Sequence, residues 1–229
     1  MPKALRFALA LALPATAAPA LADPHLSVTK TTWTSPGGCT QVVEHAEVVG
    51  LSGDAKAVID RDLVQAMIGE ALPALYQTKD DMQSACTGSV RGTSRGQVWE
   101  SGLATDRWLS VRLHQYVHGG GAPLDSYYCM TFDVRNAVGP VTTAQFYTPG
   151  TRGAFNKAIA ATYPNADAGQ RALYLGLNVA NTQIFVTKTG VEIDQVNDAG
   201  PHAAGIVTLT NGALRGASAP GGPLDLAAR

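Results

Sequence analysis

The chain has 229 residues, of which 45% are hydrophobic and 15% are charged, and its formal net charge at pH 7 is −1. This composition is typical of one globular domain with a substantial core, and it excludes disordered, collagen-like and coiled-coil proteins. The slight negative charge also argues against a nucleic-acid partner.

The first 22 residues have the pattern of a bacterial secretory signal. Lys3 and Arg6 give a basic start, residues 7–13 are apolar, and Ala20-Leu21-Ala22 is an A-x-A cleavage site. We therefore expect cleavage after Ala22, a periplasmic or secreted location, and no membrane span in the rest of the chain. Loss of Lys3 and Arg6 would change the formal net charge from −1 to −3.

The N-terminal half of the mature chain predicts two strands followed by a helix. Residues 26–33 and 41–49 have strand composition around a Ser-Pro-Gly-Gly turn. An apolar stripe at helical spacing predicts a helix over 55–69, which Pro73 ends or restarts. The polar stretch 77–96 has no clear periodicity.

Residues 107–134 carry the clearest pattern in the chain. Alternation with a period of two over 107–117, and again over 127–134, predicts two strands. A glycine-rich turn after His118 separates them, and residues 97–103 predict a strand before them. One face of the strand 107–117 is largely apolar. The other face carries Trp108, Ser110, Arg112, His114 and Tyr116.

The C-terminal part predicts shorter elements. These are a strand over 138–146, a second, shorter helix over 153–163, a hairpin over 182–196 and a last strand over 205–210. From residue 216 the chain is mainly Ala, Gly and Pro, which favours a loose tail. Strands that flank two helices without regular β-α alternation indicate a single α+β domain, with an antiparallel-rich sheet packed by one long and one short helix.

Three cysteines allow one disulfide in an oxidising compartment. Three pairings are possible, and the sequence does not choose among them. We favour Cys39–Cys86, because Cys129 lies mid-strand, where a buried free thiol is common. No two cysteines lie within four residues of each other, which argues against a zinc or redox site.

Two fragments match esterase motifs. Residues 92–96 fit the G-x-S-x-G nucleophile elbow around Ser94, and residues 118–121 fit the HGGG oxyanion motif. The elbow needs a buried strand before it and a helix after it, whereas here a polar segment precedes and a strand follows. The order of the two motifs is also reversed relative to that fold, so we interpret both matches as coincidences.

A metal site is not expected either. His114 and His118 would share one face of a strand but lie roughly 13 Å apart at 3.3 Å per residue, too far to share an ion. We therefore predict solvent-facing histidines, no metal and no other cofactor.

The polar face of the strand 107–117 suggests a binding surface. Trp, Tyr and Arg are enriched in binding hot spots because they contribute a large contact area at a small entropic cost. The alternative is that a second layer, such as a helix, covers this face.

The order of several motifs resembles one bacterial extracytoplasmic domain. The motifs are residues 108–113, Tyr116, the glycines 119–121, residues 131–134, residues 185–191 and residues 200–205. This order, over about residues 40–215, is similar to the C-terminal domain of RsiV-type anti-sigma factors and PdaC-type peptidoglycan deacetylases. The chain departs from that family at three positions. Ala122 stands where the family has a turn histidine, His118 where threonine is usual, and His202 where it has tyrosine.

The resemblance implies an exported, non-enzymatic α+β binding module over residues 23–215, between the signal (1–22) and a flexible tail (216–229). It also implies lysozyme, another cell-wall hydrolase or peptidoglycan as the partner. The alternatives are an envelope ester hydrolase that uses Ser94 and a structural envelope protein of unknown ligand. The expected binding residues are Trp108, Arg112, Tyr116, His118, Gly119, Gly120 and Tyr127.

Overall fold

The computed structural model describes residues 23–69, 75, 78–119, 123–142, 145, 153, 156–157, 160–161, 164–165, 167, 184–194, 206–215 and 219–227. They form a mixed α+β fold with two β-sheets, which confirms the predicted class.

The larger sheet has six strands in the order β1-β2-β3-β4-β5-β6. Its strands are β1 (His25–Thr34), β2 (Thr40–Val49), β3 (Ser94–Ala104), β4 (Trp108–His118), β5 (Leu124–Asp133) and β6 (Val138–Pro140). Neighbouring strands are antiparallel, except that β2 and β3 run parallel. The connection between β2 and β3 contains helix α1 (Gly53–Gly69), because a parallel pair requires a long crossover.

The main core lies between α1 and one face of the larger sheet. The apolar stripe of α1 supplies Ile59, Leu63 and Ala66, which pack against the apolar face of β4. The same cluster contains Val48, Trp99, Leu109, Val111, Leu113, Met130, Phe132 and Val134. The helical period of α1 and the two-residue period of β4 thus meet in one buried layer.

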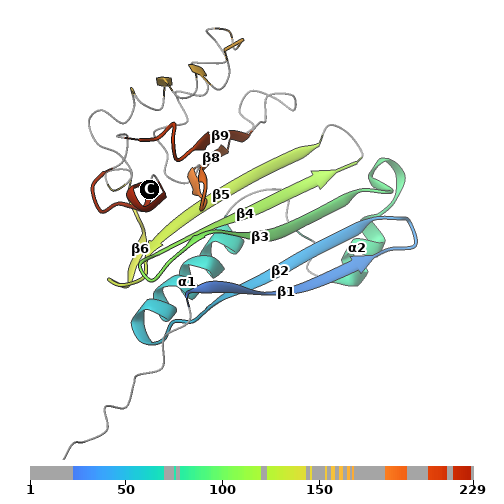
Figure 1. The fold of residues 1–229 in the computed structure, drawn as a ribbon. Helices are drawn as coiled ribbons and strands as arrows, with labels where there is room; N and C mark the ends of the chain where they lie inside the picture. Colours follow the sequence, from blue (N-terminus) through green and yellow to red (C-terminus); the bar gives the residue numbers. More distant parts are fainter. Residues whose placement is uncertain are drawn as a thin grey trace, which may run out of the picture.

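The smaller sheet covers part of the opposite face. It consists of β7 (Ile184–Val186), β8 (Gly190–Asp194) and β9 (Ile206–Thr210), all antiparallel. Figure 1 shows α1 and this sheet on opposite sides of the larger sheet. Gly102 permits the close approach, because a Cβ atom there would lie 2.1 Å from the Val186 carbonyl oxygen. The second layer is therefore a sheet, where we had suggested a helix.

The segment without periodicity contains a helix that the sequence analysis missed. Helix α2 (Lys79–Ala85) begins at Thr78, whose side chain accepts a hydrogen bond from the Asp81 backbone while the Asp81 carboxylate accepts one from the Thr78 backbone. This capping box starts a helix that is too short to display an apolar stripe and buries only Met82. A 3₁₀ turn over Gly88–Val90 follows.

The predicted disulfide is confirmed. Cys39 and Cys86 are bonded, with their Cα atoms 5.9 Å apart, and Cys129 is a buried free thiol. The bridge links the start of β2 to the end of α2. It holds the segment before β3 to the β1–β2 hairpin.

Two C-terminal expectations differ from the structure. The strand predicted over 138–146 ends at Pro140, and the described residues after it are not strand. The expected loose tail contains helix α6 (Pro223–Ala227), which contacts β7 and β8 and buries Leu224 completely.

The remaining predictions are met only in part by the described residues. Gly153 and residues 156–157 and 160–161 of the second predicted helix are helical, while the rest of that helix and the motif at 200–205 lie outside the described part. No helix in the described part is long and apolar enough to cross a membrane.

Candidate functional site

The face of β4 that we predicted as a binding surface divides into two halves. Trp108, Ser110 and Arg112 are buried, and Ser110 and Arg112 contact the smaller sheet at Val186 and Glu192. His114 and Tyr116 are partly exposed, and His118 is exposed. The predicted site residues therefore do not form one accessible surface, because the second layer covers the first half.

Arg112 links the two sheets. Its side chain is only 6% exposed, and its guanidinium donates to Glu100 on β3 and to Glu192 on β8, at 2.5 and 2.8 Å. Its Cζ atom also lies 4.4 Å from the centre of the Phe185 ring. A buried guanidinium between two carboxylates and an aromatic ring holds layers together. Arg112 thus has a structural position.

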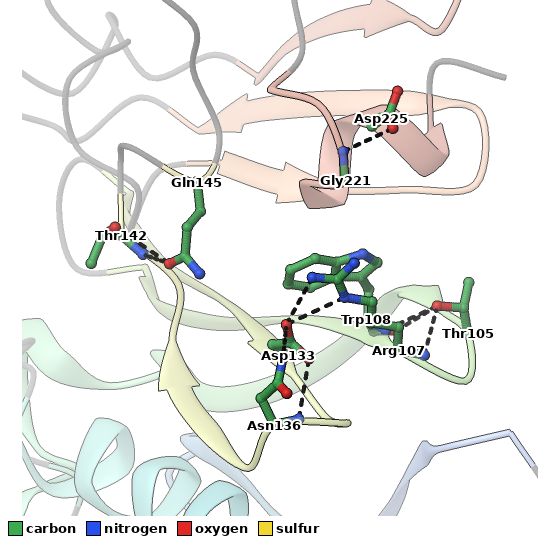
Figure 2. Close-up of polar contacts among 9 residues, drawn as sticks. All are labelled: Thr105, Arg107, Trp108, Asp133, Asn136, Thr142, Gln145, Gly221 and Asp225. Carbon is green, nitrogen blue, oxygen red and sulfur yellow. Dashed lines mark hydrogen bonds and ion pairs between the residues drawn. The ribbon is translucent and has the colours of Figure 1, made fainter.

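Trp108 also has a structural position, at the other end of β4. Its indole is 1% exposed, and the Arg107 guanidinium lies over the ring, 4.6 Å from its centre. Figure 2 shows Arg107 directed to Asp133, which also binds Asn136, with Gly221 of the C-terminal segment nearby. These contacts lie at the end of the β4–β5 pair that approaches Gly221.

The uncovered half carries a row of four rings, which we call the ring row: Tyr127, His114, Tyr116 and His118. His114 stacks on Tyr127 with ring centres 4.5 Å apart. The centres of His114 and Tyr116 are 5.5 Å apart, and those of Tyr116 and His118 are 5.0 Å apart. The row follows from strand geometry, since residues two apart on β4 share a face and Tyr127 on β5 pairs with His114.

Asp125 joins the two histidines of the ring row. His114 Nε2 lies 2.7 Å from Asp125 Oδ1, and His118 Nε2 lies 3.2 Å from the same oxygen. Because a carboxylate only accepts hydrogen bonds, both Nε2 atoms are donors here. The histidines that we expected to be separate thus converge on one side chain. No group in the described part of the chain has the composition and geometry of a metal site.

The sequence analysis does not include Asp125 in the site, although the pairing of the two strands predicts its position. Asp125 pairs with Tyr116 across β4 and β5, so it lies between His114 and His118 on the same face. The antiparallel pairing of β4 with β5 fixes this register and places Asp125 in the ring row.

Two glycines fit the site closely. A Cβ atom at Gly96 would lie 2.8 Å from the Tyr116 ring, so the absence of a side chain at position 96 makes room for that ring on β3. Gly119 has a φ of +93°, and a Cβ atom there would lie 3.2 Å from the Gly92 carbonyl oxygen. Gly120, also predicted, lies outside the described residues.

Ser94 lies beside the ring row. It pairs with His118 in the register of β3 and β4, and His118 contacts Asp125. Within the described part of the chain, no hydrogen bond joins the side chains of Ser94 and His118. Ser94 is the first residue of β3 and follows a 3₁₀ turn, so the strand–turn–helix context of a nucleophile elbow is absent.

Comparison with solved structures shows which proteins share this fold. A DUF3298 family member from Bacteroides fragilis superposes with a TM-score of 0.56 at 13% identity, covering 86% of this chain and 93% of that one. A DUF3298 family protein from Pseudomonas aeruginosa gives a TM-score of 0.54 at 14% identity, covering 88% and 95%. The chain has the fold of DUF3298 family proteins.

Comparison by sequence finds nothing further: no family model matches the chain, and no curated protein does. At these identities the structural similarity concerns the fold and not the site. DUF3298 denotes a domain of unknown function, so the site must be interpreted from its own residues.

Proposed function

We propose that this protein is an extracytoplasmic, non-enzymatic binding module whose ring row contacts a basic protein of the cell-wall environment, with c-type lysozyme as the first candidate. The proposal rests mainly on the ring row itself. Four rings and a carboxylate occupy the half of the β4–β5 face that the smaller sheet leaves uncovered.

The chemistry of the ring row suits cationic side chains. Lysine and arginine bind over tyrosine rings through cation–π contacts, and Asp125 can accept a hydrogen bond from them. A net charge of −3 after loss of the signal would attract a strongly basic partner at long range. The resemblance to the RsiV-type domain, which binds lysozyme, supports the same partner.

The test is calorimetric titration of the purified protein with c-type lysozyme at moderate salt. Saturable binding should occur. Tyr116→Ala and His118→Ala should each weaken the affinity by roughly tenfold or more without changing the melting temperature of the protein. His45→Ala is the matched control, because His45 is exposed on β2, away from the ring row. No binding by the folded protein would remove lysozyme and make peptidoglycan fragments the next ligand to test. Equal affinity in both variants would place the contact surface elsewhere.

A second candidate function is ester hydrolysis by Ser94. One observation favours it: the register pairs Ser94 with His118, which contacts Asp125. Hydrolysis of p-nitrophenyl acetate that disappears in Ser94→Ala, and persists in the control Ser101→Ala on the same strand, would support an esterase. Activity that is absent from the wild type, or equal in Ser94→Ala, would exclude it.

A further inference from the structure

A cleft lies on the opposite side of the larger sheet from the ring row, between α1 and the edge formed by β5 and β6. Its volume is about 280 Å³, at the small end of the range for ligand sites. Its walls combine a carboxylate, an amide and a phenol with three apolar side chains. The lining residues are Asp62, Gln65, Ala66, Tyr128, Met130 and Pro140.

The carboxylate of this cleft belongs to Asp62, and its hydrogen bonds in the described part of the chain go to one of its two oxygens. The Asp62 side chain is 10% exposed, and its Oδ1 atom accepts from Nη2 and Nε of Arg61, at 2.8 and 2.9 Å. The Arg61 side chain itself is 59% exposed. Within the described part of the chain, Oδ2 has no hydrogen-bond partner. Asp62 lines the cleft, so Oδ2 is available to accept a charge-assisted hydrogen bond from a cationic ligand.

Gly139 keeps that oxygen accessible. A Cβ atom at position 139 would lie 3.0 Å from Asp62 Oδ2, closer than ordinary van der Waals contact. The residue next to Gly139 is Pro140, which lines the cleft. Any side chain at position 139 would therefore occupy the space beside Oδ2.

We propose that this cleft binds a primary alkylammonium group, with the ammonium donating to Asp62 Oδ2 and its aliphatic stem lying against Ala66, Met130 and the Tyr128 ring. An ammonium fits better than a guanidinium. A guanidinium binds a carboxylate best through both oxygens, and Arg61 already occupies Oδ1, whereas an ammonium is a compact charge that needs only one. The Tyr128 ring adds a cation–π surface.

Two sources share this chemistry: a free small amine and a lysine side chain of a partner protein. The probes are n-butylammonium and Nα-acetyl-lysine methylamide, with Nα-acetyl-norleucine methylamide as the uncharged isostere and Nα-acetyl-arginine methylamide as the guanidinium. The readout is the NMR shift of the Ala66 and Met130 methyl groups, which line the cleft. It does not depend on lysozyme binding, so this proposal and the proposed function fail separately.

The expected result is saturable shifts with an ammonium probe, weaker shifts with the arginine probe and none with the norleucine probe. Binding of both ammonium probes would show that the ammonium and stem suffice. Binding of only the lysine probe would indicate a protein side chain, and binding of only butylammonium would indicate a free amine. Equal shifts with the norleucine probe, or no saturable shift with either ammonium, would overturn the proposal.

Two variants test the atoms involved. Asp62→Asn removes the charge, and Gly139→Ala keeps the charge but fills the space beside Oδ2. Each should weaken binding by roughly tenfold or more. Asp54→Asn, at an exposed position in the first turn of α1, is the matched control. Retained binding in both Asp62→Asn and Gly139→Ala, in folded protein, would overturn the assignment to Asp62.

Discussion

Arg112 on β4 and Glu192 on β8 form an ion pair between the two sheets, with Arg112 Nη1 2.8 Å from Glu192 Oε2. The two residues are 80 positions apart in the chain. This contact helps to fix where the smaller sheet lies on the larger one, and hence which part of β4 stays uncovered. Arg112 belonged to the predicted binding surface, but its contacts predict an effect on stability.

Arg112→Ala should lower the free energy of unfolding by about 3 kcal/mol, because it removes a buried cation from two carboxylates and an aromatic ring. Urea denaturation followed by fluorescence measures this value. Arg112→Lys should recover only part of it, since one ammonium cannot replace a fork that reaches both carboxylates. Wild-type stability in Arg112→Ala would mean that other contacts hold the two sheets together.

Reduction of the Cys39–Cys86 bridge should destabilise the fold by about 4 kcal/mol, as expected for a loop with a sequence separation of 47. Cys39→Ser and Cys86→Ser should melt at similarly low temperatures, and dithiothreitol should lower the melting temperature of the wild type but of neither variant. Alkylation of the unfolded, unreduced protein should label one thiol, Cys129. Three labelled thiols in protein prepared under oxidising conditions would contradict the pairing.

Lys56 should stabilise the fold in a pH-dependent way. Its side-chain hydrogen bond to Asp60 raises the pKa of Lys56 above its ordinary value of 10.5. The contribution is therefore fully present below that value and is lost as the pH rises through the higher pKa of the folded state. The stability difference between wild type and Lys56→Met should be constant from pH 7 to 9 and shrink above pH 10.5. A difference that grows with alkaline pH would contradict the sign.

Gly96→Ala should act on the ring row from the neighbouring strand. The added methyl would lie 2.8 Å from the Tyr116 ring, which must turn away from β3. We expect lysozyme binding to weaken as in Tyr116→Ala, with a stability loss of only about 1 kcal/mol because the partly exposed ring can move. Gly153→Ala is the matched control, since a Cβ atom there meets nothing within 4 Å. Unchanged affinity in Gly96→Ala would argue against contact through Tyr116.

The success of prediction varied along the chain with the length of each element. Helix α1 and strands β3, β4 and β5 are long enough for their apolar periods to be read directly. Helix α2 has seven residues and one buried side chain, so it shows no apolar stripe at helical spacing. Only the Thr78–Asp81 capping pattern marks its start. The C-terminal helix α6 is shorter still, and its buried residues in the described part are Pro223 and Leu224.

The candidate site was predictable only in part, for a similar reason. Alternation places His114, Tyr116 and His118 on one face, and this holds in the structure. Asp125 belongs to the neighbouring strand, so its place in the ring row requires the register of β4 and β5 as well. The residues that line the cleft beside Asp62 come from three separate elements, so no local sequence pattern predicts the cleft.

By itself, the amino-acid sequence determined the α+β class, the long strands, helix α1 and the two-faced character of β4. These features depend on turn chemistry and on side-chain periods over a few neighbouring residues. Only the tertiary structure decided that Trp108 and Arg112 are covered while Tyr116 and His118 are open. For Arg112 that outcome depends on β7 and β8, which contact Ser110 and Arg112 from 76 and 80 positions away. Burial is set by whichever remote segment packs on a surface, and no local pattern in β4 specifies it.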